Sequence, residues 1–190
     1  MEPHLGNNDK ILFNQYLIKA TIFFEYGSGG STYQASNREN IQKVYSVESD
    51  IAWYNKVKQN IKNSKVTYYL NEMDTIPNNW GHPGNKATTE QKQNYSNYIM
   101  KLSKEEQQSI DLVFIDGRFR VACCLKCYNV IKDDCLIIFD DFLDRSYYHI
   151  VLDYFDIVDK TVDNRMVVLK KKQGLQIPQE IIDKYEMIAK

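Results

Sequence analysis

Short hydrophobic runs alternate with amphipathic helical patterns along most of this chain. Runs that are short, rich in β-branched and aromatic residues and apolar throughout predict buried strands, at 21–25, 44–47, 66–70, 111–116 and 136–140. Between them, apolar residues recur at three- and four-residue intervals and predict helices, at 9–19, 31–38, 50–61 and 118–131. Strands that alternate with helices imply an α/β fold with a parallel sheet and right-handed crossovers.

The C-terminal third predicts a different arrangement. Residues 143–155 have helical spacing, and two further strands follow at 155–160 and 166–171. Asp163 and Asn164 between these strands are turn formers, so we expect an antiparallel hairpin there. A last amphipathic helix is predicted at 178–189.

The chain has 190 residues, enough for one α/β domain with a full core and too few for two, so we expect a single domain over 1–190. Residues 1–20 are predicted to form an N-terminal helical cap that could cover a ligand. Between residues 71 and 101 the pattern stops in a stretch rich in turn formers. We expect a lid-like insertion there, with a mobile polar loop as the alternative.

A glycine turn separates two strands that each end in an acid. Glu25 ends the first strand, Gly27 and Gly29 follow it, and Glu48 closes the second strand at the spacing of about 20 residues that suits a ribose contact. The third glycine of the dinucleotide fingerprint would fall at position 32, which is Thr32. The pattern therefore favours a nucleoside cofactor without a pyrophosphate, with Glu25 facing an ammonium group and the helix start facing a carboxylate.

With Ile110 to Gly117 and Cys135 to Asp141 added, the chain resembles the class I S-adenosylmethionine-dependent methyltransferases. The resemblance implies a Rossmann-like, doubly wound, seven-stranded sheet, mostly parallel with an antiparallel last strand. It implies S-adenosyl-L-methionine as the cofactor. The cofactor-binding residues it implies are Glu25, Gly27, Ser28, Gly29, Ser31, Thr32, Glu48, Ser49, Trp53 and Asp116.

Asp116, Asp140 and Asp141 end two strands that are neighbours in this fold, and they are the candidate ligands of a divalent metal, Mg²⁺ or Mn²⁺. These acids resemble those of macrocin-type sugar O-methyltransferases, and more loosely those of catechol O-methyltransferase. The second acid of the macrocin Asp-Gly-Asp pattern is Arg118 here, which cannot act as a base. The candidate catalytic residues are Asp116, Asp141 and, as substitute base, His149.

Basic and aromatic residues near these acids are candidates for binding the acceptor substrate. Arginines could clamp a phosphate or carboxylate, although ion pairs with Asp141 or Asp144 would occupy them equally well. Aromatic residues of the insertion could stack on a substrate, Tyr95 and Tyr98 among them. The expected acceptor-binding residues are Arg118, Arg120, Arg145, Trp80 and His82.

Net charge and cysteine content indicate which binding partners and which cellular location to expect. Lys and Arg total 24 against 25 Asp and Glu, so a net charge of −1 gives no sign of a nucleic-acid or membrane surface. Cys124 and Cys127 have zinc-ligand spacing but fit the apolar face of a helix, so we expect reduced, packed thiols and a cytoplasmic protein. The last helix fits either an intramolecular cap or a homodimer contact.

The sequence thus predicts an O-methyltransferase that acts on a hydroxyl of a sugar, glycan or similar small molecule, with or without a metal. Three alternatives remain open: a metal-free methyltransferase with another acceptor, a nicotinamide-dependent oxidoreductase, and a non-catalytic nucleoside-binding relative. Thr32 and the lack of a Tyr-x-x-x-Lys pair beside a plausible active serine disfavour the oxidoreductase.

Overall fold

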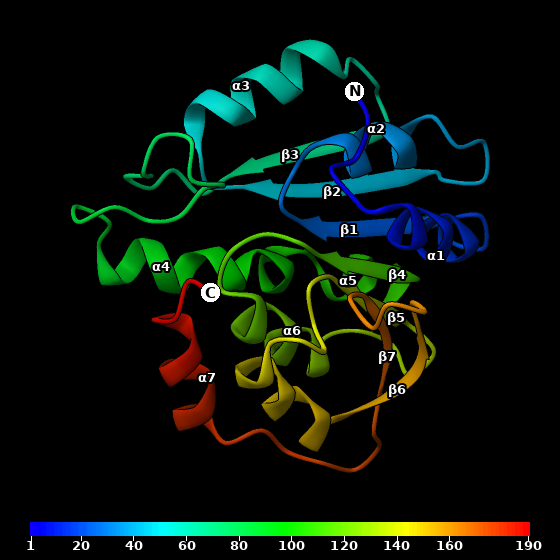
Figure 1. Cartoon of the computed structure of the whole chain (residues 1–190), viewed down its shortest axis with the longest axis vertical. Coiled ribbons are helices and arrows are strands. Elements are labelled where there is room, and N and C mark those ends of the chain that lie inside the picture. The colour runs from blue at the N-terminus through cyan, green and yellow to red at the C-terminus, as the bar shows by residue number, and fades with distance from the viewer.

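A computed structural model describes residues 1–190 and shows a single seven-stranded sheet flanked by helices (Figure 1). The strands run in the order β3-β2-β1-β4-β5-β7-β6. The first five are mutually parallel, and β7 is antiparallel to both β5 and β6. The strands are β1 (Ile22–Tyr26), β2 (Lys43–Glu48), β3 (Val66–Leu70), β4 (Leu112–Ile115), β5 (Leu136–Phe139), β6 (Phe155–Lys160) and β7 (Val167–Lys171).

Seven α-helices and two 3₁₀ helices connect and cover these strands. They are α1 (Asn7–Leu17), α2 (Gly30–Ser36), α3 (Ile51–Asn60), α4 (Thr89–Ser96), η1 (Asn97–Lys101), α5 (Lys104–Ser109), α6 (Arg120–Tyr128), η2 (Ser146–Asp153) and α7 (Gln179–Glu186). None of the helices is long and apolar enough to span a bilayer.

Successive strand residues face opposite sides of the sheet, which divides the core in two. Phe23 and Phe114 pack with Phe13 of α1 in a cluster of 14 buried residues. Phe24 and Val113 belong to a cluster of 33 on the other face, where α6 lies. All four cysteines are buried and free, and three of them lie on α6 in this larger cluster, as expected for packed thiols.

The predicted fold class is confirmed, including the antiparallel hairpin, where Asn164 has a φ of 60° in the turn between β6 and β7. Three local predictions were wrong in detail. The helix predicted at 143–155 is the 3₁₀ helix η2, and the irregular insertion contains α4 and η1. The helix predicted to begin at Arg118 begins at Arg120, because Phe119 adopts a left-handed backbone conformation with a φ of 54°.

Candidate functional site

The candidate site lies where the strand order reverses, between β1 and β4. Connections run outward in opposite directions from these two strands, which leaves a crevice at their carboxyl ends, the usual ligand position in open α/β sheets. Gly27 has a φ of 97°, and a Cβ placed on it would lie 2.9 Å from the backbone nitrogen of Gly117. The loop after β1 and the loop after β4 therefore touch, and glycine is required for that contact.

Glu25 lies beneath the glycine loop, fully buried. Its carboxylate accepts hydrogen bonds from the hydroxyls of Ser31 (2.6 Å), Ser46 (2.7 Å) and Thr32. Burial raises the pKa of Glu25 to about 7, against the hydrogen bonds from Ser31, Ser46 and Thr32 that lower it. Glu25 therefore links β1 to β2 and to the start of α2 through buried hydrogen bonds. It does not face outward, which corrects the prediction that it faces an ammonium group.

Glu48 ends β2 and is nearly buried, with 6% of the residue exposed. One carboxylate oxygen accepts from the backbone nitrogens of Ser49 (2.7 Å) and Asp50 (3.0 Å), and the other from that of Ser28 (3.2 Å). Burial raises the pKa of Glu48, although these backbone hydrogen bonds oppose the shift. This carboxylate therefore links the glycine loop to the start of α3, where the sequence predicts a ribose contact.

Trp53 lies on the glycine loop. Its indole nitrogen donates to the Ser28 carbonyl at 2.8 Å, and its ring is the nearest group to a Cβ placed on Gly29. The backbone nitrogen of Trp53 is itself held by Asp50, which caps α3 as the sequence predicts. Trp53 thus supports the loop as well as lying near the predicted adenine position.

The N-terminal residues cross the start of α2. A Cβ placed on Gly30 would lie only 2.0 Å from the nitrogen of Pro3 and 2.1 Å from the carbonyl carbon of Glu2. In Figure 1 the N-terminus lies beside α2 and α3, and the chain then descends to α1. The predicted cap is therefore divided: α1 packs on the sheet face through Leu12, Phe13 and Leu17, and only residues 1–4, the N-terminal strap, cover the loop.

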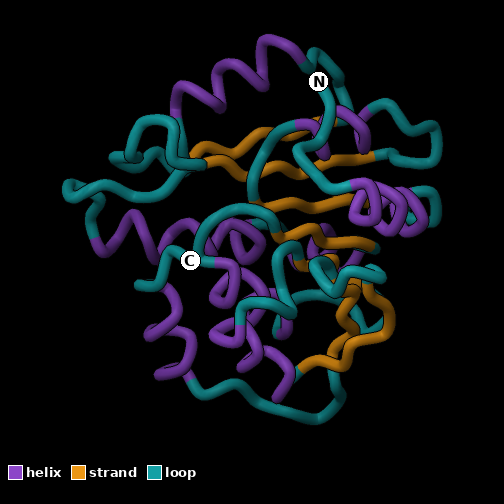
Figure 2. Tube along the Cα trace, viewed as in Figure 1, coloured by secondary structure: helices purple, strands orange, loops and turns teal.

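The tip of the insertion covers the neighbouring part of the site. A Cβ placed on Gly81 would be 3.3 Å from the Ser49 hydroxyl and 3.8 Å from a Glu48 carboxylate oxygen. The Trp80 carbonyl accepts a hydrogen bond from Arg118 Nε at 3.0 Å, and the Trp80 ring lies 4.9 Å from that of His4 in the strap. Loops between β3 and α4 project beyond the strand ends in Figure 2. The strap and this tip meet over the predicted cofactor loop.

Other aromatic residues of the insertion lie away from solvent or away from the acids. Tyr95 is 1% exposed, and a Cβ placed on Gly117 would lie only 2.2 Å from its hydroxyl oxygen. Tyr98 donates to the Leu70 carbonyl at 2.7 Å. His82 lies with residues 187–190 around an open pocket of about 480 Å³. These contacts make Tyr95 and Tyr98 structural, which corrects the expectation that they stack on a substrate.

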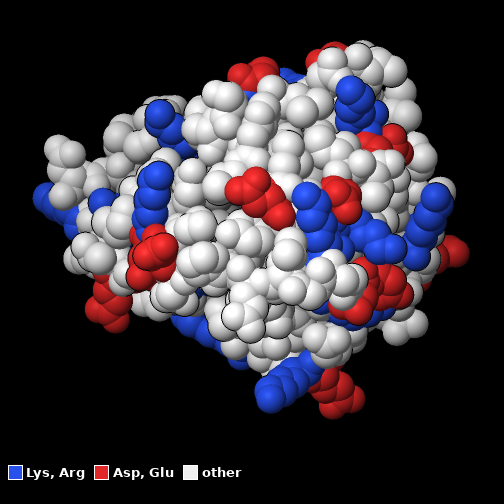
Figure 3. Space-filling view, turned by 90° about the horizontal axis from the view of Figure 1, so that it is seen from below, with Lys and Arg blue, Asp and Glu red and all other residues white.

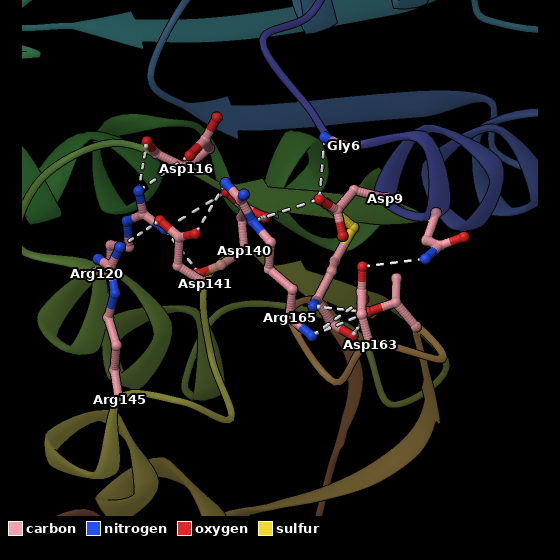
Figure 4. Close-up of polar contacts among 12 residues, drawn as sticks. Gly6, Asp9, Asp116, Arg120, Asp140, Asp141, Arg145, Asp163 and Arg165 are labelled. Carbon is pink, nitrogen blue, oxygen red and sulfur yellow. Dashed lines mark hydrogen bonds and ion pairs between the residues drawn. The ribbon is translucent and has the colours of Figure 1, made fainter.

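The strand-end acids do converge, as predicted, but around an arginine (Figure 4). Arg120 Nη2 lies 3.0 Å from Asp116 Oδ1, and Arg120 Nη1 lies 3.3 Å from Asp141 Oδ2 and 3.9 Å from Asp140 Oδ2. Only 4% of the Arg120 side chain is exposed. Arg120 is therefore internal and does not face an acceptor, which corrects the prediction that it binds substrate.

The carboxylates are occupied by further arginines as well. Arg145 pairs with Asp141 at 2.8 Å, the ion-pair alternative expected from the sequence. Arg165, from the turn before β7, contacts Asp141 at 2.9 Å, Asp140 at 3.7 Å and Asp9 of α1 at 3.4 Å. The prediction that Asp116, Asp140 and Asp141 hold a divalent metal does not fit this donor set, because guanidinium groups contact the same carboxylates.

Asp140 has the least exposed side chain of the three strand-end acids. It is 2% exposed, and its Oδ1 has no hydrogen-bond partner; the same holds for Oδ1 of buried Asp9. Burial, followed by the charges of Asp116 and Asp141, raises the pKa of Asp140 to about 8. The raised pKa favours the neutral carboxyl form of Asp140, while Asp116 keeps the most accessible carboxylate, with 33% of its side chain exposed.

His149, the predicted substitute base, does not join the acids. Its ring packs 5.4 Å from that of Phe142, and its Nε2 is buried without a hydrogen-bond partner. The residue that η2 directs toward the acids is Tyr148, whose hydroxyl contacts Arg145 at 3.3 Å. The turn at Asp141, with a φ of 57°, and the 3₁₀ geometry of η2 rotate His149 away from the position that an α-helix predicts.

Sequence reasoning missed Asp9, Arg165 and the N-terminal strap. Asp9 accepts from the Gly6 backbone nitrogen at 3.1 Å, so its position three residues past Gly6 is a helix-start signal. Nothing in the sequence pairs Arg165 with Asp9, because the two are far apart along the chain and meet only through tertiary packing.

No protein-family model matches the chain, and no curated protein matches it as a relative. Among solved structures, a methyltransferase-like protein from Silicibacter pomeroyi has a TM-score of 0.79 and 24% identity, over 100% of this chain and 98% of that one. A caffeoyl-CoA O-methyltransferase candidate from Staphylococcus aureus has a TM-score of 0.54 and 16% identity, over 90% and 86%. A tRNA (m1A58) methyltransferase from Aquifex aeolicus has a TM-score of 0.57 and 11% identity, over 90% and 72%. With its strand order and these neighbours, the chain has the Rossmann-like fold of the class I methyltransferases.

Proposed function

We propose that this protein is an S-adenosylmethionine-dependent O-methyltransferase whose acceptor is a hydroxyl of a sugar, glycan or similar small polar molecule. The observation that carries the proposal is the position of Asp116. This partly exposed carboxylate follows β4, and its backbone nitrogen donates to the Tyr26 carbonyl at the end of β1 at 3.0 Å. A carboxylate thus lies at the crevice, next to the loop that is predicted to hold the methyl donor.

The cofactor fit is supported by the glycine contact and by the acid that follows β2. Gly27 turns the chain away from β1 with no side chain, and Glu48, at the end of β2, is the predicted partner of the two ribose hydroxyls. Bound S-adenosylmethionine would supply a methyl group that its sulfonium already activates for transfer. The protein therefore has to supply alignment, exclusion of water and a proton acceptor.

Asp116 is the proposed proton acceptor in place of His149. As the acceptor oxygen forms its bond to the methyl carbon and the carbon–sulfur bond breaks, the hydroxyl proton passes to the Asp116 carboxylate. Burial raises the pKa of Asp116, although Arg120 opposes that shift, so the group is a stronger base than an exposed aspartate. Arg118 lies beside it and ties this loop to the insertion tip.

Transfer to a nucleic-acid base is the second candidate, because tRNA methyltransferases are among the structural neighbours. The surface gives it less support. Acidic and basic side chains are interspersed among larger neutral areas on the face in Figure 3, and the net charge of the chain is −1. Broad basic surfaces are the usual footprint of nucleic-acid binding.

Substitution of Asp116 tests the proposal. With radiolabelled donor and a panel of sugars, nucleotide-linked sugars and catechols, wild-type protein should transfer methyl groups to at least one acceptor hydroxyl. Asp116→Asn should lower kcat by about 100-fold or more, since general-base catalysis contributes that much. Binding of S-adenosylhomocysteine to Asp116→Asn, measured in parallel, separates loss of the proton acceptor from loss of a cofactor contact.

The matched control is Asp144→Asn, which alters an exposed acid close to the site and should leave the rate unchanged. Transfer to tRNA without transfer to any hydroxyl would instead favour the second candidate. Equal rates for wild type and Asp116→Asn would remove Asp116 from the chemistry.

A further inference from the structure

Arg120 lies at the centre of the strand-end acids and uses every part of its guanidinium. Besides the Asp116 and Asp141 carboxylates, Nη1 donates to the Asp140 carbonyl at 2.7 Å, Nε to the Gly117 carbonyl at 2.9 Å and Nη2 to the Asp116 carbonyl at 3.3 Å. One side chain thus joins the loop after β4 to the loop after β5 (Figure 4). Five N–H donors in a fixed plane suit this task, which a lysine could not perform.

The local backbone explains why Arg120 points inward. Buried Phe119 takes a left-handed conformation, which an aromatic residue adopts only when its surroundings enforce it, and α6 begins directly after it. As the first residue of α6, Arg120 directs its side chain back over the preceding turn, toward Asp116 four residues earlier. The strained residue therefore sets the direction of the arginine.

Electrostatics keep the guanidinium charged in this position. Burial lowers the pKa of Arg120, but the negative charge around it, that of Asp116 first, outweighs burial and raises the pKa above its ordinary value. A buried charge is stable only when it is paired and hydrogen-bonded, and Arg120 is both. Removing it would leave the carboxylates of Asp116 and Asp141 without the cation between them.

A divalent cation would need the same oxygens. Mg²⁺ and Mn²⁺ bind carboxylate oxygens at about 2.0–2.2 Å, and Asp116 Oδ1 and Asp141 Oδ2 already face Arg120. Two cations on the same oxygens would repel each other strongly at that distance. Arg120 and a divalent metal are therefore mutually exclusive at this edge of the sheet.

We propose that Arg120 is a built-in cation that replaces a divalent metal among the strand-end acids and positions Asp116, so that methyl transfer needs no metal. The positioning part rests on the proposed function above, whereas the exclusion of a metal does not. Arg120 is a positioning residue: it holds the carboxylate that receives the proton and does not contact the acceptor.

Manganese binding tests the exclusion independently of activity. We would titrate wild-type protein with Mn²⁺ and follow binding by calorimetry and by the electron paramagnetic resonance signal of free Mn²⁺. Any Mn²⁺ binding to wild type should be the same in Asp141→Asn, because the Asp141 carboxylate does not hold a metal. Arg120→Gln frees the carboxylate oxygens and should bind Mn²⁺ at least tenfold more tightly than wild type. Arg120→Lys loses most of these hydrogen bonds but keeps a positive charge there, so it should bind Mn²⁺ no more tightly than wild type.

Binding of Mn²⁺ to wild type that is lost in Asp141→Asn would overturn the proposal, and so would unchanged weak binding in folded Arg120→Gln. If Arg120→Gln does not fold, as circular dichroism would show, the comparison of wild type with Asp141→Asn still decides the question. Asparagine tolerates the left-handed conformation of position 141, so this variant keeps the turn.

Activity supplies the second readout. Methyl transfer by wild type should be unchanged by EDTA, and a tenfold or greater loss on chelation would contradict the proposal. Absence of methyl transfer together with the expected Mn²⁺ results would reject the proposed function and leave the exclusion of a metal by Arg120 standing.

Discussion

Individual side chains at this site are defined by what already surrounds them. Glu25 and Glu48 each accept three hydrogen bonds from neighbouring groups, and Asp141 pairs with three arginines. Asp140 differs from them, because one of its oxygens is buried with no hydrogen-bond partner. Ionisation of this carboxyl group should therefore change the stability of the fold.

Replacement of Asp140 should change how stability depends on pH. The folded-state pKa of about 8 lies above the ordinary value of 3.8. Between about pH 4 and pH 8 the unfolded chain has therefore lost this proton, while the folded chain still holds it. The free energy of unfolding should thus fall as pH rises through that window. Asp140→Asn cannot ionise, and relative to wild type it should gain at least about 1 kcal/mol between pH 5 and pH 8.5 in denaturant titrations.

Glu25 contributes a slope of the same sign, since its pKa is raised to about 7, so part of the pH dependence should remain in Asp140→Asn. The exposed acid Asp144 provides the control, and Asp144→Asn should follow wild type. A stability difference between Asp140→Asn and wild type that is constant with pH would show that Asp140 is ionised in the folded protein.

At the scale of elements, two segments that are remote in sequence cover one loop. The N-terminal strap contacts Gly30, the insertion tip contacts Glu48 and Ser49, and the rings of His4 and Trp80 join the two. The tip has three left-handed positions within four residues, at Asn78, Trp80 and Gly81, so its conformation is held by its contacts. We expect both segments to move when a cofactor enters.

Displacement of the strap tests this expectation. Gly30→Ala would place a methyl group 2.0 Å from Pro3, so the strap has to leave, although alanine itself favours the helix by about 1 kcal/mol. Hydrogen exchange of residues 1–6 should accelerate, and release of S-adenosylhomocysteine in stopped flow should speed up several-fold. Deletion of residues 1–4 should accelerate release of S-adenosylhomocysteine to the same extent.

In the protein that lacks residues 1–4, adding Gly30→Ala should have no further effect on release, because the group it strikes is gone. Slower or unchanged release in both single variants would show that the strap does not cover the cofactor. An additional effect of Gly30→Ala in the shortened protein would mean that the methyl group disturbs the loop itself.

The sequence predicts well those elements whose pattern of apolar and capping residues is compatible with only one kind of secondary structure. Buried parallel strands such as Leu112–Ile115 are continuous apolar runs, and Asp50 is both the predicted and the observed cap of α3. The start of α6 was missed by two residues, because no glycine marks the left-handed position at Phe119. The direction of Arg120 follows from that turn, so a metal was predicted where an arginine lies.

At the scale of the whole molecule, the order of strands assembles the site. The reversal between β1 and β4 brings Gly27 against Gly117, and the pairing of β5 with β7 brings Arg165 to Asp140 and Asp141. α1 joins the same cluster through Asp9. Such pairings across the chain depend on tertiary packing, which explains why the sequence predicts the cofactor loop but not the arginines that fill the acidic cluster.

The most direct test of the account is calorimetric titration of the full chain with S-adenosylhomocysteine, comparing wild type, Glu48→Gln and the exposed control Glu39→Gln. Wild type and Glu39→Gln should each show saturable binding of one ligand per chain. The affinity of Glu48→Gln should be about 10- to 100-fold weaker, since hydrogen bonds from the ribose to a charged acceptor contribute about 1.5–3 kcal/mol. No binding to wild type, or equal binding to wild type and Glu48→Gln, would contradict a cofactor site at the glycine loop.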